Sequence, residues 1–597
     1  TAVPLARLPG ITAQRFGGRA QEINIRGFSG DFSTTTLNGR EQVSLGNNRG
    51  VEFDQYPSEV MSSVVVYKTQ NAALVGQGLS GTVDLRTVRP LTYDKRTVAL
   101  NLRGDMNKVD DHKEYGNRFS AMYIDQFRDN TIGLALGYAR LDNPGQSREF
   151  ASWGYDNGLL GGAEVFNYQT KNRRDGVTGT LQFRPNDRWE STLDVFYSKF
   201  DVDQNRAGLQ FGTVWGSTGQ PISSTRNENN LVTHAVFQNL RPVVRNDENN
   251  YRDKLTSIGW KNEFTINEAW SMSLALSHSS ADRKHQIMEG YAVLNPAMAG
   301  DRLEMTFNPS GWFDLSTGYD YTDASILRLA DPGGWGGDRW QAGYLKDMTI
   351  EDQLNAARFD FEYAFADGPF SKLDFGVNFT ERTKSRASDE NTLCLAANCA
   401  SSNQIFAQIP SDGIAGISPG FAGIDNVMDL DLGGMLGSTY ILLPKNHPDI
   451  SNKNWEVKEK LWTAYIQANI DTELMGAPLT GNFGVQAVRT DQSSDAIAMF
   501  NGVPISGTAS YGAKYTELLP SLNLKLALPT DLNVRFGLGR QMARPRMDEM
   551  VASANFGYDP IKQEFNGSGG NAALRPWIAN AVDLSVEKYF GETGYVT

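Results

Sequence analysis

The feature that most constrains this fold is a repeated segment of about ten residues in which apolar side chains occupy every second position. Leu, Val and Phe alternate with Asn, Lys and Arg in residues 522–528 and 532–538. Because successive side chains of a strand point to opposite faces, these segments are strands with one apolar face and one polar face. Residues 131–141 show the same period with a small second face: Ile132, Leu134, Leu136 and Tyr138 alternate with Gly133, Ala135, Gly137 and Ala139. Many such strands in sequence predict an antiparallel transmembrane β-barrel with a wet lumen.

Composition narrows the class further. The chain has 597 residues, of which 40% are hydrophobic. No run approaches the roughly 18 apolar residues that a membrane helix needs, which excludes a helical membrane protein. The net charge of -13 argues against a nucleic-acid partner, because phosphate binding needs a basic face. Cys394 and Cys399 lie in a polar stretch without a nearby His, so we expect a loop disulfide and no metal site.

The chain divides into two parts. Residues 1–92 have a mixed pattern with many turn residues, and we expect a compact separate domain there; residues 93–597 carry the strand pattern. We predict fourteen strands, at 96–105, 116–126, 131–141, 176–185, 189–200, 254–266, 269–281, 351–365, 371–384, 458–471, 478–491, 513–528, 531–543 and 579–590, with a further one starting at Tyr595.

The connections between these strands alternate in length. Short turns follow the strands that end on one side, for example at 128–130, 186–188 and 529–530. Long stretches follow the strands that end on the other side, at 201–253, 282–350, 385–457 and 544–578. This asymmetry is typical of an outer-membrane barrel, with short turns on one side and long loops on the other. Long loops in compact proteins are usually functional, so we expect binding in the long stretches.

An ordered set of motifs resembles the plug domain of TonB-dependent outer-membrane transporters. The matching segments are Ile25-Arg26-Gly27, Leu37-Asn38-Gly39, Pro57-Ser58-Glu59-Val60, Val65-Val66-Tyr67-Lys68, and Gly76-Gln77-Gly78-Leu79-Ser80-Gly81 continuing through Arg86 to Pro90. Ala543-Arg544-Pro545 and Leu574-Arg575-Pro576 match the family's barrel. Gly76, Gly78 and Gly81 also fit a dinucleotide fingerprint, but a strand-like segment follows them where that fingerprint needs a helix. Segments such as 51–57 are similar to a proteobacterial branch known from Caulobacter and Xanthomonas, several members of which are implicated in carbohydrate uptake.

The resemblance implies an outer-membrane barrel of about 22 strands around an N-terminal plug. It implies TonB, with its inner-membrane energising complex, as a partner, outer-membrane lipid around the barrel, a small-molecule substrate, no cofactor and no catalysis. A surface lipoprotein capping the barrel stays open. Because only fourteen full strands are visible, and the family's TonB box would lie upstream of Thr1, we expect the chain to be truncated at both ends.

Four charged residues of the plug motifs are expected to lie between plug and barrel wall: Arg26, Glu59, Lys68 and Arg86. One interpretation is a set of ion pairs that keeps the plug closed and releases it under force. The alternative is that these charges only solubilise a small domain in a wet lumen.

The long stretches are rich in tryptophan beside glycine. Indole rings together with Asn and Asp suit sugars, which stack on aromatic faces and need hydrogen-bond partners for their hydroxyls. We therefore expect import of an oligosaccharide, with a ferric siderophore as the alternative. An enzyme is not expected because the five His are scattered without a nucleophile motif, and a passive porin would need no plug. The candidate binding residues are Trp153, Trp215, Trp312, Trp335 and Trp340; for each, an aromatic girdle or loop packing is the competing interpretation.

Overall fold

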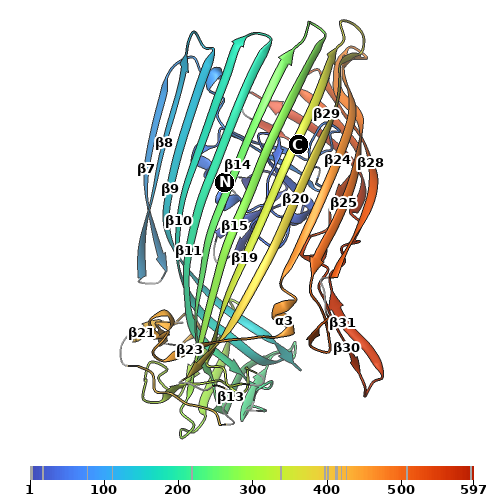
Figure 1. Ribbon diagram of the computed structural model, residues 1–597. Coiled ribbons are helices and arrows are strands. Elements are labelled where there is room, and N and C mark those ends of the chain that lie inside the picture. Colours follow the sequence, from blue (N-terminus) through green and yellow to red (C-terminus); the bar gives the residue numbers. More distant parts are fainter. Residues whose placement is uncertain are drawn as a thin grey trace.

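The computed structural model is a tall barrel with loops gathered at one end (Figure 1). It describes residues 5–16, 19–76, 78–109, 112–216, 219–336, 339–395, 399, 403–410, 414–417, 420–424, 426–505, 509–591 and 594–597. Within these residues, no helix has both the length and the apolar character to cross a membrane.

The main sheet is a closed antiparallel barrel. Each of the fourteen predicted strands is present, and the short β33 follows them. The long strands are β7 (Thr97–Val109), β8 (His112–Phe127), β9 (Ile132–Asp156), β10 (Leu159–Asn186), β11 (Trp189–Gly212), β14 (Val243–Thr265), β15 (Trp270–Leu294), β19 (Gly343–Ala364), β20 (Phe370–Leu395), β24 (Trp455–Leu474), β25 (Ala477–Ala496), β28 (Ala509–Leu528), β29 (Leu532–Ala543) and β32 (Trp577–Phe590), with β33 at Gly594–Val596. Two short strands, β18 (Leu327–Leu329) and β23 (Tyr440–Pro444), join the same sheet.

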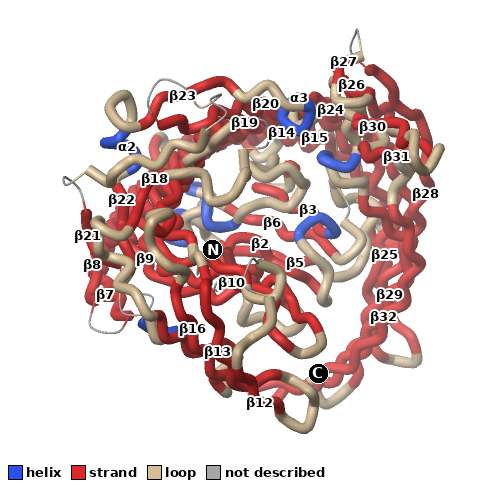
Figure 2. Tube along the Cα trace, turned by 90° about the horizontal axis from the view of Figure 1, so that it is seen from below, coloured by secondary structure: helices blue, strands red, loops and turns tan. Residues whose placement is uncertain are grey.

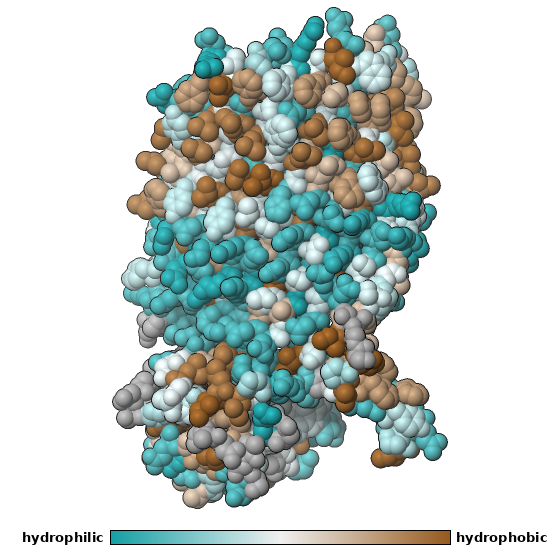
Figure 3. All heavy atoms as spheres, in the orientation of Figure 1, coloured by the Kyte–Doolittle hydropathy of each residue, from teal (hydrophilic) through white to brown (hydrophobic). Residues whose placement is uncertain are grey.

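The two-residue period separates outside from inside as predicted. On β9, Leu136 is exposed on the outer face, whereas Ala135 and Ala139 are buried. A Cβ added to Gly137 would lie 3.1 Å from Val60 of the N-terminal domain, so the small face of this strand is what allows that domain to pack closely. The outer apolar residues form a band across the upper part of the barrel face shown in Figure 3, next to the short turns.

The strands continue beyond the predicted limits mainly at the loop end, and β24 also extends three residues at the short-turn end, to Leu474. Prediction placed the end of one strand at residue 141, but β9 continues to Asp156, and β10 already begins at Leu159. Below the apolar band the outer surface of the wall is hydrophilic (Figure 3). Alternation of apolar and polar residues therefore fades there although the backbone ladder continues, and periodicity alone could not detect these extensions.

The N-terminal domain lies inside the ring of barrel strands (Figure 2). It contains a hairpin, β1 (Ile11–Phe16) with β2 (Arg19–Ile25), and a sheet in the order β4 (Arg40–Glu41), β3 (Ser33–Leu37), β6 (Gly81–Arg86) and β5 (Ser63–Tyr67). Short 3-10 turns lie at Gly30–Phe32, Phe53–Gln55, Ser58–Val60 and Pro90–Thr92. Its apolar core also includes Phe196 and Leu255 of the wall, so plug and barrel share one buried cluster.

The long stretches expected as loops contain structure of their own. A four-stranded sheet is formed by β12 (Ser223–Arg226), β13 (Val232–Leu240), β16 (Asp301–Asn308) and β17 (Trp312–Thr317). The other short elements are β21 (Ile414–Ile417), β22 (Val427–Leu430), α2 (Leu432–Met435), α3 (Pro448–Ser451), β26 (Ala498–Phe500), β27 (Val503–Pro504), β30 (Ala554–Asp559) and β31 (Glu564–Gly569), with 3-10 turns at Gly420–Ala422 and Met547–Glu549. The largest buried apolar cluster lies among these loops and the strand ends that carry them.

Candidate functional site: the plug–barrel contact and its cavities

Buried ion pairs join the plug to the barrel wall on the loop side. Glu459 of β24 is fully buried and accepts two hydrogen bonds from Arg49 of the plug, at 2.9 and 2.5 Å. Arg544 donates to the same carboxylate at 3.1 Å and also pairs with Glu41 of the plug. Because each charge has at least one opposite partner, the contact is both buried and charge-compensated.

The same network extends to two neighbouring strands. Asp352 of β19 accepts from Arg382 of β20 at 2.9 and 2.6 Å, and Lys384 lies 3.3 Å from it. Lys384 is fully buried and donates to the Ser44 hydroxyl of the plug at 2.7 Å, while the Ser44 N–H donates to Asp352 at 3.2 Å. Backbone and side chains of the plug are thus part of the wall's own charge network.

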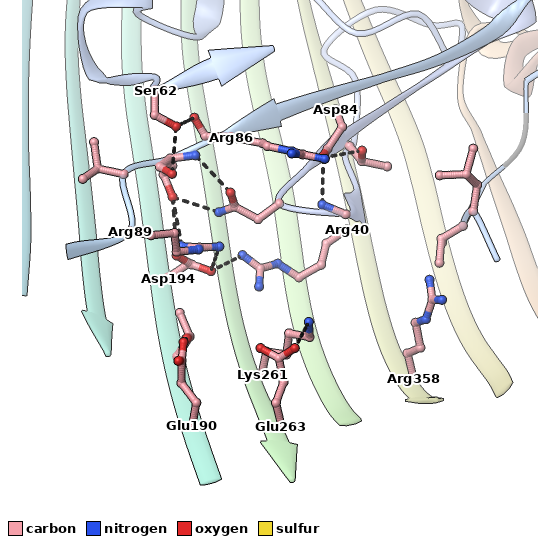
Figure 4. A pocket seen from close by; sticks show the side chains of 18 of the residues that line it. Arg40, Ser62, Asp84, Arg86, Arg89, Glu190, Asp194, Lys261, Glu263 and Arg358 are labelled. Atoms are coloured by element: carbon pink, nitrogen blue, oxygen red, sulfur yellow. Dashed lines mark hydrogen bonds and ion pairs between the residues drawn. The ribbon is translucent and has the colours of Figure 1, made fainter. Parts of the chain in front are cut away.

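A second contact lies toward the short turns, in a 610 Å³ cavity between plug and wall that we call the periplasmic cavity. Figure 4 shows Arg40 and Arg89 of the plug reaching Asp194 of β11 from two directions. The distances are 2.7 Å from Arg40 and 2.6 Å from Arg89. Lys261, Glu263 and Arg358 line the same cavity from the wall.

The plug turn at residues 71–74 is fixed by hydrogen bonds from the wall to its backbone carbonyls. Gln486 of β25 donates to the carbonyls of Ala72 and Leu74, at 3.0 and 2.9 Å. Arg358 donates to the carbonyl of Ala73 at 2.8 Å. Wall side chains therefore satisfy the backbone of a plug segment that has no strand partner of its own.

Two of the four charged plug residues expected to face the wall do so. Arg26 pairs with Asp583 of β32 at 2.6 Å, and Glu59 lies 3.7 Å from Arg118 of β8. Burial opposes ionisation of Glu59, but a backbone hydrogen bond and the nearby guanidiniums lower its pKa overall.

Lys68 and Arg86 bond within the plug, although Arg86 also lines the periplasmic cavity between plug and wall, and their role there stays a prediction. Lys68 donates to the carbonyl of Pro9, and Arg86 pairs with Asp84 at 2.9 Å, so both are satisfied inside the plug. Lys68 directly follows β5 and Arg86 ends β6, and each side chain has its bonding partner within the same domain.

The motif residues beside these charges form tight turns. Asn38 and Gly39 both have positive φ and connect β3 to β4, which is the Asn-Gly geometry of a two-residue hairpin. Arg26 and Gly27 also have positive φ and form a tight turn between Ile25 and Phe28. This turn directs Arg26 toward the wall. A Cβ added to Gly78 would meet backbone at 2.6 Å and one added to Gly81 at 2.5 Å, while Gly76 has positive φ.

A 500 Å³ cavity, here the apex cavity, opens on the loop side between plug and wall. Its guanidiniums come from Arg19, Arg148 and Arg283, and its carboxylates from Glu22, Glu52, Glu149 and Asp253; Tyr168, Phe200 and Tyr251 supply aromatic faces. The cations are already engaged. Arg283 forms two hydrogen bonds with Asp253, at 2.8 and 2.7 Å, and Arg19 lies 3.3 Å from Asp54.

Two carboxyl groups of the plug at the apex cavity have altered acidity. Burial raises the pKa of Glu52 to about 7, against the lowering influence of Arg283 and the Leu45 N–H. Burial also raises the pKa of Glu22. Both groups therefore take up protons more readily than an exposed glutamate, which reduces the negative charge facing the cavity.

The five tryptophans are not gathered in one site. Trp153 and Trp215 pack over neighbouring glycines, Gly162 and Gly161, at the β9–β10 corner. Trp312 has its ring centroid 5.9 Å from that of Phe421 and donates to Asp314.

The remaining two lie in one loop. Trp335 contacts Tyr291 edge to face with centroids 4.8 Å apart, and the N–H of Trp340 donates to the carbonyl of Cys399. None of the five is among the described residues that line the periplasmic or apex cavity, and their role in binding stays a prediction. Cys394 and Cys399 form a disulfide beside this loop.

Sequence reasoning missed the residues that join plug and wall most extensively: Arg40, Arg49, Asp194, Asp352, Arg382, Lys384 and Glu459. One signal was present. Arg382, Lys384 and Asp352 occupy inward positions of predicted strands, where a charged side chain needs an internal partner. Which residue supplies that partner cannot be read from spacing, because Arg49 and Glu459 are 410 positions apart.

Comparisons with known proteins agree with this architecture. Residues 4–83 match the family model described as TonB-dependent Receptor Plug Domain, and residues 301–597 match TonB dependent receptor-like, beta-barrel. Comparison with curated protein sequences gave no significant match.

Two solved structures illustrate the similarity of fold. The siderophore receptor PiuA from Acinetobacter baumannii is 12% identical, with a TM-score of 0.51 over 99% of this chain and 68% of that one. The ferric-catecholate import receptor Fiu from E. coli K12 is also 12% identical, with a TM-score of 0.53 over 98% of this chain and 68% of that one. The chain therefore spans about two thirds of the length of these structures.

Receptors of this family are transporters rather than enzymes. The plug inside the barrel, the band of outward apolar residues, the asymmetric connections and the two family matches lead to one conclusion. The chain belongs to the family of TonB-dependent outer-membrane receptors.

Proposed function

We propose that this protein imports a neutral oligosaccharide across the outer membrane, with residues 1–92 as plug domain and residues 93–597 as barrel. In this proposal TonB, energised from the inner membrane, displaces the plug, and outer-membrane lipid surrounds the apolar band. The ligand enters from the loop side and reaches the apex cavity before the plug moves.

The observation that carries the substrate class is the charge balance of the apex cavity. Three guanidiniums and four carboxyl groups line it; Arg283 pairs with Asp253 of the lining, and Arg19 pairs with Asp54 beside it. An anionic ligand would have to displace Asp253 from Arg283, which would leave a buried carboxylate unpaired. A neutral polyhydroxyl ligand can instead stack on the aromatic faces and hydrogen-bond with the amide and carboxylate groups already present.

A ferric siderophore is the second candidate. The three guanidiniums of the apex cavity favour this candidate, because they would attract an anionic iron chelate. The two candidates make opposite predictions about salt. Affinity for a charged chelate falls steeply as ionic strength rises, whereas affinity for a neutral sugar does not.

The test is calorimetric titration of the purified full-length protein with neutral oligosaccharides and, separately, with ferric siderophores, at low and high salt. The proposal predicts saturable, salt-insensitive heat with an oligosaccharide, and loss of that binding in Tyr251→Ala. Binding of iron chelates alone would overturn the substrate class while leaving the fold unaffected.

The predicted tryptophan site is tested by a double variant. Trp335→Ala with Trp340→Ala should weaken oligosaccharide binding about tenfold without altering the melting temperature, since the partly exposed Trp335 ring would present a stacking surface. Unchanged affinity would remove this loop from the site.

A further inference from the structure

A separate cavity of 570 Å³ lies on the loop side, against a different part of the wall. Asn47 of the plug, Trp455 of β24 and the loop residues Asn452, Asn555, Ser568 and Asn571 line it. We call it the amide cavity because four of its lining residues are asparagines. The amide cavity and the apex cavity share no lining residue. Gly46 lines the apex cavity, and the next residue, Asn47, lines the amide cavity. The plug apex therefore separates the two.

Three buried side-chain atoms of the amide cavity have no hydrogen-bond partner among the described residues: Oδ1 of Asn47, Oδ1 of Asn452 and Nε of Arg386. Leaving such atoms unpaired costs free energy, and native proteins rarely do so without a reason. A ligand would meet these atoms once the three side chains turn toward the cavity, and two acceptors and one donor then suit hydroxyl groups, because a hydroxyl both donates and accepts.

The remaining lining also favours a neutral ligand with an apolar face. The lining holds two cations, Arg386 and Lys453, and two carboxylates, Asp548 and Glu549. Lys453 pairs with Glu390 at 2.7 Å, and Asp548 pairs with Arg546 at 2.8 Å. Trp455 packs in a small apolar cluster with Val457 and Met550 and also lines the cavity. The indole is therefore fixed by packing before any ligand arrives, which lowers the entropy cost of stacking.

One wall of the amide cavity is a turn with a counterpart elsewhere in the chain. Residues 571–574 read Asn-Ala-Ala-Leu, and Gln492 of β25 donates to the carbonyls of Ala572 and Leu574, at 2.8 and 2.7 Å. This turn places Asn571 in the cavity lining.

The plug turn 71–74 has the same sequence and makes the same pair of bonds to Gln486. In both turns the third residue donates its N–H to the Asn side chain at 2.9 Å. Both glutamines lie on the same face of β25, but the plug turn lines the periplasmic cavity. Gln486 is thus a matched control for Gln492.

We propose that the amide cavity is a second carbohydrate subsite that takes a neutral sugar unit of a ligand whose other end occupies the apex cavity. The inference rests on the proposed function and extends it. The ligand must be a chain long enough to cross the plug apex, because one short sugar cannot fill both cavities.

The test measures affinity against chain length, with linear maltodextrins and xylo-oligosaccharides as probes. We expect affinity to rise with length in one of the two series until both cavities are occupied. Asn452→Ala should remove about tenfold of the gain seen with long chains and leave short chains unaffected. Gln492→Leu should do the same through loss of the 571–574 turn, whereas Gln486→Leu should leave length dependence intact.

Trp455→Phe gives an independent signal. It should abolish the part of the fluorescence change that only long chains produce. Equal affinity for short and long chains, or equal effects of Gln492→Leu and Gln486→Leu, would overturn the subsite. If a sugar binds and only Tyr251→Ala weakens it, the subsite fails and the proposed function stands; if no sugar binds, both fail.

Discussion

Glu459→Gln is the substitution that most directly tests the ion pairs between plug and wall. Glu459 is completely buried and serves Arg49 of the plug and Arg544 of the wall. The amide keeps the size of the side chain but removes the charge. Removing one partner of a buried pair costs about 3–5 kcal/mol. Because Arg544 keeps its second partner, Glu41, we expect the lower value. The free energy of unfolding of the plug should fall by about 3 kcal/mol.

The assay follows urea unfolding of the plug through a single reactive cysteine. Thr35→Cys is suitable because Thr35 is buried in β3, and the two native cysteines are joined to each other. With a urea slope of about 1 kcal/mol per molar for a domain of this size, labelling should begin about 3 M earlier in Glu459→Gln.

The control is Asp491→Asn. Its partner Lys514 is 68% exposed in the side chain, so the pair contributes less than about 1 kcal/mol. Equal midpoints for the two variants would refute the reasoning that burial makes the Glu459 contact strong.

Three further expectations concern other parts of the molecule. Because the pKa of Glu52 is raised from 4.5 to about 7, the folded plug keeps a proton that the unfolded chain loses. The contribution of Glu52 to stability is therefore complete below pH 4.5 and is lost as the pH rises through about 7. In Glu52→Gln the melting temperature should fall less over this pH range. Gly137→Val should loosen plug docking by about 1–3 kcal/mol in the labelling assay, since the new Cβ would lie 2.5 Å from a wall hydroxyl, whereas Gly179→Ala meets its nearest neighbour at 3.7 Å and should be neutral. Replacing Cys394 and Cys399 by Ser should change barrel unfolding by no more than about 2 kcal/mol, because the bridge closes a very small ring.

The strands were predictable because one physical pattern specifies them. Alternation requires only that one face meets lipid and the other the lumen, and both conditions hold along the part of each strand inside the apolar band. Outside it, as in residues 142–149 of β9, neither face is apolar and the pattern disappears although the ladder continues.

The site was less predictable because it depends on distant pairs. Lys68 and Arg86 have the same charge and domain as Arg26, but of these three only Arg26 forms an ion pair with a described wall residue. The loop structure was hidden for a similar reason. The apolar residues that pack together there, such as Phe237 and Leu327, come from separate loops and leave no local period.

Uptake of labelled oligosaccharide by cells producing the full-length protein, with and without TonB, tests the central claim most directly. The barrel is filled by a plug that buried charges fix to its wall, so passage requires work on the plug. We predict uptake that depends on TonB and stops when the inner-membrane proton gradient is collapsed. Equal uptake in cells lacking TonB would show an open diffusion pore and contradict the account.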